Sequence, residues 1–436
     1  MELQILVLVI LLLSFAFFGK LVFHNIINPI TMMCGIWAII LFAYSFHAYE
    51  LYYASDKSLL LIAIGVMMFF CGSVFMCLIK RFHMESEYTT FKYETQKPNY
   101  RLLIVLNILA IVCFFGFLVE TIQLLRRGIG FNYIHRFYDM EEGTIGGSQF
   151  SHYIQEWFVW PLCLATSPLA AISFLSDGEK TAERKWFLIT TIINLAMFVV
   201  ITGKRANIGY VVIYFVMVMM LQRRKVQMKF RTKVLLLGGL IALIAAFNYI
   251  TVSRGSESIF RSLYIYLCGC VPCFSIKLDG IPISTQYGLM SFHGIYRAPM
   301  ILISSIIRLP SFIQIRRVFA QLITYTQERV FIGPGMGYNA FVTPFFYFYV
   351  DFGLIGVIVL SFLFGMFCTS VYIKYLKQRS YRSLSIYLLV AYGIFMSMVR
   401  FQFVQMRYVL AFLYLLLPYA KTLGVRITLK NKRHTI

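Results

Sequence analysis

Long apolar runs, separated by short polar or charged segments, dominate the pattern along this chain. Many of them approach or exceed the roughly 18–22 apolar residues that cross a bilayer as a helix. We place eleven spans at about 3–19, 29–46, 58–79, 102–122, 157–175, 186–202, 206–221, 234–250, 352–373, 384–402 and 407–423. Alternating segments of about ten residues, which are typical of a transmembrane β-barrel, do not recur. The pattern therefore predicts an all-α polytopic membrane protein, with residues 1–436 forming one integral membrane domain.

The first run, Leu3–Gly19, has no basic segment before it and no small-residue cleavage site after it, so we interpret it as a retained span. The composition agrees with this class, because 60% of the residues are hydrophobic and only 13% are charged. Cys268, Cys270 and Cys273 lie close together, but no His pair or second Cys-x-x-Cys segment accompanies them. We therefore expect neither a metal ion nor another cofactor.

Lys and Arg residues in the loops predict the orientation, since cytoplasmic loops of membrane proteins carry an excess of both. Four basic segments stand out, at 80–101, 222–233, 374–382 and after 423. All four fall on one side of the membrane if the N-terminus is outside and the C-terminus is inside.

This orientation leaves two large external loops, 123–156 and 251–340. Within the second loop, the apolar pieces Tyr264–Ile276 and Pro299–Ile307 are too short to span, so we expect re-entrant or interfacial helices there. The Gly-rich segment 333–337 predicts a tight turn, and 339–350 predicts a short half-helix directly before the span that begins near Phe352.

Arg and Lys divide unequally between the two sides. The predicted cytoplasmic side has fourteen Lys and ten Arg, whereas the external side has three Lys and thirteen Arg. The external arginines are Arg126, Arg127, Arg136, Arg205, Arg254, Arg261, Arg297, Arg308, Arg316, Arg317, Arg329, Arg400 and Arg407. Arg binds phosphate through a planar pair of donors, so this set predicts a phosphorylated ligand at the outer leaflet. Nucleic acid is excluded as a partner, because no basic soluble domain is present to bind it.

The alternative is that these arginines pair with external acids. The acids on that side include Asp139, Glu141, Glu142, Glu257, Asp279 and Glu328, which are too few to pair with all thirteen arginines. Arg205, Arg254, Arg400 and Arg407 also lie at the ends of predicted spans, where an ionisable group is costly and usually functional. The ligand hypothesis is therefore favoured over pairing.

Three stretches resemble the bacterial oligosaccharide repeat-unit polymerases of the Wzy type. They are 198–221, which contains Thr-Gly-Lys-Arg between two spans, Val252–Gly255, and Gly333–Phe367. The positions similar to the family pattern are Gly337, Asn339, Thr343, Tyr349, Asp351, Phe352, Gly353, Gly356 and Gly365. The resemblance covers the C-terminal half, whereas the N-terminal half is similar only in having many spans.

The resemblance implies a glycosyltransferase-C-like membrane fold and a place in the bacterial plasma membrane. Such polymerases transfer a growing chain from undecaprenyl pyrophosphate onto a lipid-linked repeat unit at the outer face, in the synthesis of O-antigen, capsule or exopolysaccharide. The implied partners are these lipid-linked oligosaccharides, the bilayer, a flippase and a chain-length regulator. Both substrates carry a pyrophosphate at the membrane surface, which agrees with the ligand that the external arginines predict.

For the reaction we expect Arg205 and Arg254 to bind pyrophosphate, with Arg297 and Arg329 as the next candidates. Fixed guanidinium groups would stabilise the charge that develops on the leaving pyrophosphate without a metal. His293 is either a proton acceptor for the attacking sugar hydroxyl or a polar loop residue.

Three residues near the expected half-helix complete the candidate site. Asn339 and Thr343 would position the substrate or fix the half-helix. Asp351 would either cap the helix that follows it or act directly in the site. Two other functions stay open: a flippase or other transporter of lipid-linked oligosaccharides, and a ligase that transfers finished polysaccharide to another acceptor.

Overall fold

The computed structural model describes residues 2–80, 97–129, 153–176, 181–202, 206–222, 259–281, 285–307, 310–339 and 341–419. Its membrane helices are α1 (Glu2–Phe23), α2 (Pro29–Ser45), α3 (Asp56–Ile79), α4 (Tyr100–Arg126), α7 (Trp160–Leu175), α8 (Ala182–Thr202), α9 (Ala206–Gln222), α15 (Thr343–Gln378), α16 (Tyr381–Phe395) and α17 (Met406–Leu416). Within these described parts, seven helices are long and apolar enough to cross a membrane, and three more are apolar but shorter. The prediction of an all-α polytopic membrane protein is confirmed.

The number of spans is a separate question. The expected span 234–250 lies outside the described residues. The count of eleven and the side of the membrane that each end faces therefore stay predictions.

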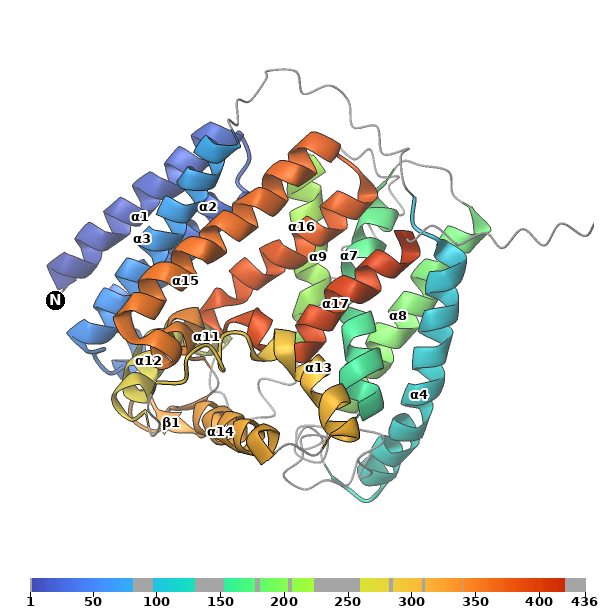
Figure 1. Cartoon of the computed structure of the whole chain (residues 1–436). Coiled ribbons are helices and arrows are strands. Elements are labelled where there is room, and N and C mark those ends of the chain that lie inside the picture. Colours follow the sequence, from blue (N-terminus) through green and yellow to red (C-terminus); the bar gives the residue numbers. More distant parts are fainter. Residues whose placement is uncertain are drawn as a thin grey trace, which may run out of the picture.

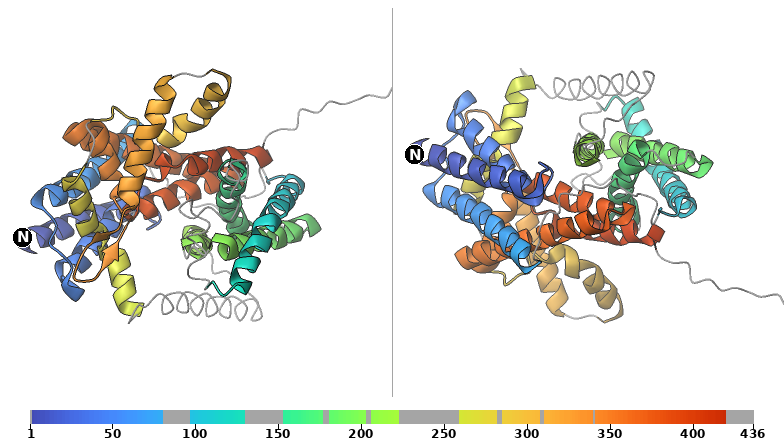
Figure 2. Two further views of the ribbon diagram at one scale, coloured as in Figure 1. Left: turned by 90° about the horizontal axis from the view of Figure 1, so that it is seen from below. Right: turned by 90° about the horizontal axis from the view of Figure 1, so that it is seen from above.

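The helices form two groups that meet along α9, α16 and α17. Helices α1, α2, α3 and α15 lie on one side and α4, α7 and α8 on the other (Figures 1 and 2). The first group shares a large apolar core, and the second has a smaller core of its own between α4, α7 and α8. Many outward-facing Leu, Ile, Val and Phe side chains remain exposed, as expected of a surface that faces lipid.

Two glycines allow α3 and α15 to pack closely. A Cβ atom at Gly72 would come within 2.0 Å of the Phe362 carbonyl oxygen, and one at Gly365 within 2.1 Å of the Phe69 carbonyl oxygen. Small residues at such a crossing let two backbones approach inside a bilayer, where packing rather than water drives helix association. Gly365 of the motif thus has a packing role.

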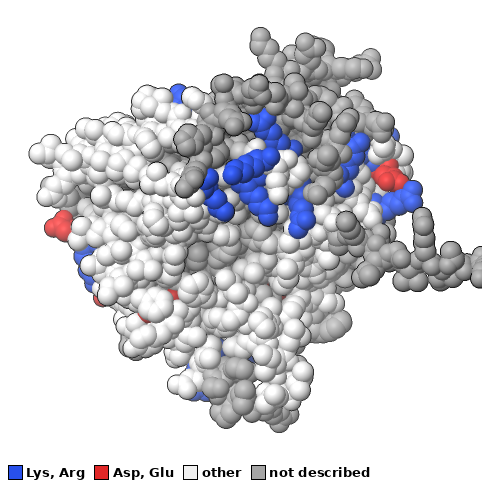
Figure 3. Space-filling model, turned by 45° about the horizontal axis from the view of Figure 1, so that its top comes forward, with Lys and Arg blue, Asp and Glu red and all other residues white. Residues whose placement is uncertain are grey.

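Basic segments gather at one end of the bundle. There the Asn99 amide donates to the Pro418 carbonyl oxygen, which joins the start of α4 to the chain just after α17. Arg101 pairs with Glu183 at the start of α8, and Ser380 forms a capping box with Ser383 at the start of α16. Figure 3 brings this end forward and shows Lys and Arg side chains gathered on it.

A layer of short helices and a β-hairpin lies at the opposite end (Figure 1). It contains α11 (Ile259–Cys268), α12 (Cys270–Asp279), α13 (His293–Ile306), α14 (Pro310–Gln327) and the strands β1 (Val330–Phe331) and β2 (Gly337–Tyr338). The short helices expected in the loop 251–340 are therefore present, while α14 and the hairpin were not foreseen. The Gly-rich segment is a tight turn, as expected, but it joins the two strands of the hairpin.

Candidate functional site

The helix α15 is broken at Phe352 and Gly353, close to its N-terminal end. Phe352 has φ −142° and ψ 17°, and Gly353 has φ 61°, a left-handed value that an L side chain rarely adopts. The break separates a half-helix, Thr343–Asp351, from the long span that follows. The predicted half-helix is confirmed, and the Asp-Phe-Gly segment forms the break at its C-terminal end.

Asp351 ties this break to the turn that precedes α13. Its carboxylate is fully buried and accepts hydrogen bonds from the Met290 amide at 3.0 Å and the Ser291 amide at 2.6 Å. The Asp351 carbonyl oxygen also accepts from the Tyr287 amide at 3.0 Å. The expectation that Asp351 caps the following span is therefore wrong, because its oxygens are directed to residues 290 and 291. We assign it a positioning role and not a direct contact with substrate.

His293 begins α13 and is bound to the segment between α16 and α17. Its Nδ1 lies 3.1 Å from the Val404 carbonyl oxygen, so Nδ1 carries the proton and donates it. The ring is 3% exposed and stacks on Phe319. The pKa of His293 is lowered to about 3, mainly by burial and also by the nearby Arg297 charge, while the Val404 bond opposes the shift. A base this weak does not suit proton abstraction at neutral pH, which disfavours the catalytic role expected for His293.

A second interruption separates α16 from α17, and the start of the half-helix contacts it. The amides of Val342 and Thr343 both donate to the Val399 carbonyl oxygen, at 3.0 and 3.4 Å. Thr343 forms a parallel bridge with Arg400, and its φ of 63° is strained for a β-branched residue. Its Oγ1 is buried and has no hydrogen-bond partner in the described structure. Thr343 thus fixes the half-helix, while a substrate contact stays a prediction.

Three interrupted segments meet here, and we call them the junction: the turn at 286–294, the half-helix with its two ends at 342–353, and the connection at 399–405. Non-helical backbone near a membrane is tolerated where it is buried in protein or lines a cavity. Broken helices of this kind build the ligand sites of many transporters. The junction therefore has the architecture of a binding site.

One arginine, Arg400, belongs to the junction, and a second, Arg297, lies just beyond it on α13. Arg297 lies one helical turn after His293, and Arg400 lies beside Thr343, where its charge acts on the Tyr347 hydroxyl. Both side chains are partly exposed. Neither has an ion pair with a carboxylate in the described part of the chain. Both guanidinium groups thus remain available to an anion.

Arg407 differs from these two, because its charge is already paired. It contacts Glu156 at 3.7 Å, donates to the Gln405 side chain at 2.7 Å and lies 4.0 Å from the centre of the Trp160 ring. Its position at a span end therefore has a structural explanation, which weakens the prediction that it binds a ligand.

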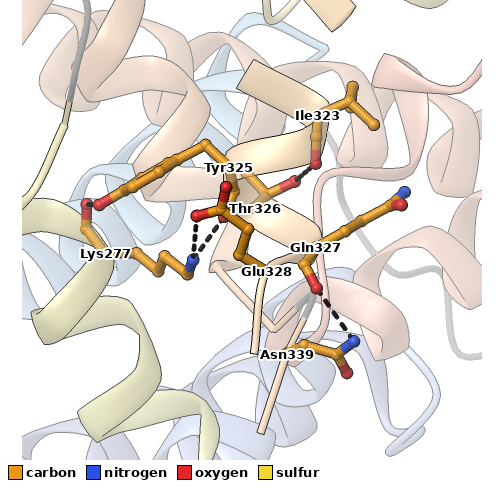
Figure 4. A network of polar contacts seen from close by, with 7 residues as sticks. All are labelled: Lys277, Ile323, Tyr325, Thr326, Gln327, Glu328 and Asn339. Carbon is orange, nitrogen blue, oxygen red and sulfur yellow. Dashed lines mark hydrogen bonds and ion pairs between the residues drawn. The ribbon is translucent and has the colours of Figure 1, made fainter. Parts of the chain in front are cut away.

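Arg329 and Asn339 belong to the hairpin and not to the junction. Arg329 is exposed, and its guanidinium lies so close to Gly337 that a Cβ atom there would overlap it. Asn339 donates from Nδ2 to the Gln327 carbonyl oxygen at 3.1 Å and fixes the end of the hairpin to the end of α14 (Figure 4). The structure thus gives Asn339 a supporting role, and its contact with substrate stays a prediction.

A buried lysine also holds the end of α14 and the hairpin in place. Lys277 of α12 donates to the Tyr325 carbonyl oxygen and lies 3.9 Å from a Glu328 carboxylate oxygen, while the Tyr325 hydroxyl donates back to the Lys277 carbonyl oxygen at 2.7 Å (Figure 4). Burial lowers the pKa of Lys277, and the Glu328 charge opposes this. The network anchors α14 on α12 and so holds the hairpin in place.

The two arginines expected to bind pyrophosphate, Arg205 and Arg254, lie outside the described residues. The three clustered cysteines are buried and free. In the described segments, no group of three or more His, Cys, Asp or Glu residues is arranged to hold a metal ion.

The sequence pattern placed the interruption between the last two spans at 403–406, whereas α16 already ends at Phe395. The signal was present, since Ser397, Arg400, Gln402 and Gln405 fall within ten residues between two apolar runs that are short for spans. The contact of this segment with residues 342 and 343, far away in the chain, had no counterpart in the sequence pattern.

Comparison with protein-family models, with curated proteins and with solved structures finds no match for this chain. A function is therefore inferred from the residues and contacts described above.

Proposed function

We propose that this chain is a glycosyltransferase of the bacterial plasma membrane that polymerises oligosaccharide repeat units linked to undecaprenyl pyrophosphate. The observation that carries the proposal is the junction, where the start of α13, which carries Arg297, contacts the segment that follows Arg400, and where neither arginine has an ion-pair partner in the described chain. Arg205 and Arg254, at predicted external span ends, are further candidates for the same anion.

In the proposed reaction, a hydroxyl of the acceptor sugar attacks the anomeric carbon of the donor sugar. The new C–O bond forms as the bond between that carbon and the pyrophosphate oxygen breaks, and the hydroxyl proton is released to solvent. Negative charge grows on the leaving undecaprenyl pyrophosphate. Arginines fixed around it would stabilise that charge in the transition state.

This proposal leaves no part for His293 as the base. Its Nδ1–H bond to Val404 and its burial instead favour a role in fixing α13, and with it Arg297, at the junction. Asp351 would act in the same way from the other side, by holding residues 290 and 291.

The position of the arginines favours an enzyme over a flippase. A flippase would need polar groups along a path through the spans, whereas Arg297 and Arg400 lie at the end of the bundle that carries the short helices, which is external in the predicted topology. A polysaccharide ligase uses the same leaving group, so it is the second candidate function.

Reconstituted protein supplied with one purified undecaprenyl-pyrophosphate-linked repeat unit tests the proposal. A ladder of products is the expected result. A single conjugate that forms only when another acceptor is added would indicate a ligase. Translocation of the lipid-linked unit without any product would overturn the proposal in favour of a flippase.

A further inference from the structure

The connection between α2 and α3, residues 46–55, exposes several aromatic rings at the end of the bundle that carries the hairpin. Tyr53 is 62% exposed, and Tyr49 and Tyr52 are also exposed. Phe331 of the hairpin, 57% exposed, belongs to the same region, because the Tyr52 amide donates to the neighbouring Ile332 carbonyl oxygen at 2.8 Å. We call Tyr49, Tyr52, Tyr53 and Phe331 the aromatic platform.

The backbone beneath the platform is strained. His47, Tyr49 and Glu50 have φ of 43°, 62° and 59°, left-handed values that non-glycine residues rarely adopt. Strain of this kind persists only where the surrounding structure fixes it, and it is concentrated at functional sites. Three such residues within four positions are more than a simple connection between two helices requires.

Buried hydroxyl groups hold the strained connection in one conformation. The Tyr44 hydroxyl donates to the Tyr52 carbonyl oxygen at 2.9 Å and accepts from the Ala54 amide at 2.7 Å. The Tyr264 hydroxyl accepts from the Ala48 amide at 3.0 Å and so ties α11 to the same connection. The rings of the platform are therefore displayed on fixed backbone, which lowers the entropic cost of binding a ligand.

Polar groups surround the rings. The guanidinium of Arg329 lies 5.9 Å from the centre of the Phe331 ring, and that of Arg261 lies 5.9 Å from the centre of the Tyr49 ring. The His47 ring lies tilted against the Tyr53 ring, with 4.0 Å between the two ring centres. Rings to stack on, with donors and acceptors at their margin, are the groups that recognise a sugar, which has an apolar C–H face and a rim of hydroxyls.

We propose that the aromatic platform binds the glycan of the lipid-linked substrate, an inference that rests on the proposed function. The hairpin connects the two sites, since β2 ends at Tyr338 and the half-helix of the junction begins at Thr343. A glycan whose pyrophosphate is held at the junction would extend past the hairpin to the platform. The alternative is an interfacial belt of aromatic residues that contact lipid headgroups, but a belt needs no strained backbone.

Photo-crosslinking in cells that make the native polysaccharide tests this directly. A benzophenone amino acid replaces Tyr53 in the full chain, and the matched control replaces Tyr153, an exposed tyrosine before α7. The expected result is an adduct at position 53 that carries glycan, seen as a ladder that collapses on glycosidase treatment, with none at position 153. Adducts with phospholipid or protein alone, or no adduct at position 53, would overturn the proposal.

Substitution of the ring gives a second measurement. Tyr53→Ala should shorten the polymer and weaken glycan binding roughly three- to tenfold, the loss expected for one stacked aromatic contact. Tyr53→Phe, which keeps the ring, should behave as wild type, and so should Tyr153→Ala. If position 53 forms glycan adducts but reconstituted protein makes no product ladder, the platform is a glycan site and the polymerase proposal is wrong. If reconstituted protein makes a ladder but position 53 forms only lipid adducts, the polymerase proposal holds and the platform is not a glycan site.

Discussion

Burial decides what the polar residues of the junction are able to do. Asp351 and His293 both have the chemistry of catalytic groups, yet their polar atoms are directed to backbone partners at residues 290, 291 and 404. Arg297 and Arg400 keep partly exposed guanidinium groups. The division suggests that the buried pair positions the junction and that the arginines meet the ligand.

Replacing Arg400 tests the binding role. Arg400→Ala should cost on the order of 3 kcal/mol of transition-state stabilisation, roughly a hundredfold in turnover, as for the loss of one fixed donor to a developing charge. Arg400→Lys should recover part of this, since an ammonium keeps the charge without the planar pair of donors. Turnover is measured at matched protein levels, with Arg317→Ala on exposed α14 as the control. Full turnover in Arg400→Ala would show that the residue is not a phosphate ligand.

Asp351→Asn tests the positioning role. An asparagine offers one oxygen to the two amides, and its NH₂ group then faces the second amide donor. We expect a loss of about 1–3 kcal/mol in unfolding free energy, the usual cost of an unsatisfied buried donor. Thermal unfolding in detergent measures it, and Asp279→Asn, at the exposed end of α12, is the control. Equal melting temperatures for the two variants would contradict the hydrogen bonds described at Met290 and Ser291.

His293 predicts a dependence of stability on pH. Its folded-state pKa of about 3 lies below the ordinary value of 6.5, so below pH 6.5 the unfolded chain binds a proton that the folded chain does not. Stability should therefore fall as the pH decreases, by about 2 kcal/mol from this residue between pH 6.5 and pH 5. His293→Asn, whose Nδ2 is able to donate to Val404, should lose this part of the slope and keep its activity. A slope unchanged by the substitution, or turnover lost in a folded variant, would contradict this account.

At the scale of elements, the position of a helix break was easier to predict than the contacts that are made there. The break at Phe352 and Gly353 could be predicted, because an acid, an aromatic residue and a glycine follow a short apolar segment. The contacts of Asp351 could not, since its partners lie sixty residues earlier in a loop whose path the pattern does not define. The interruption at 396–405 was predicted only at 403–406, although Ser397, Arg400 and Gln402 already interrupt the apolar run.

Helix packing gives a prediction with a built-in control. Gly365→Leu should separate α15 from α3, because even a Cβ atom there overlaps the Phe69 carbonyl group. Overpacking of this kind costs about 1–3 kcal/mol or more, and we expect a lower melting temperature and less protein in the membrane. Gly116→Leu on α4 adds the same side chain where the new Cβ atom would have no neighbour within 4 Å in the described structure, so it should be tolerated. Similar behaviour of the two variants would argue against the close crossing.

At the scale of the whole molecule, the class of membrane protein and the grouping of loops at the two ends were easier to predict from the sequence than the candidate binding site was. The class follows from the lengths of the apolar runs, which lipid imposes directly. Segments 97–101 and 374–382 do lie toward one end, while the helices of 259–327 lie toward the other (Figure 1). The site depends on contacts between segments far apart in the chain, such as those between Thr343 and Arg400, and no local pattern encodes these.

The sidedness of the molecule is the last prediction, and the role of the external arginines depends on it. Tyr287 is 80% exposed beside the junction, and Lys377 is exposed near the opposite end of α15. Tyr287→Cys should therefore react with a membrane-impermeant maleimide on intact cells, whereas Lys377→Cys should react only after the cells are permeabilised. The described native cysteines give little background, because all but Cys71, Cys77 and Cys113 are buried, and these three lie within the predicted spans 58–79 and 102–122. Labelling of Lys377→Cys but not Tyr287→Cys on intact cells would put the junction in the cytoplasm. The positive-inside rule would then account for Arg297 and Arg400, and the argument for a pyrophosphate ligand at the outer face would lose its basis.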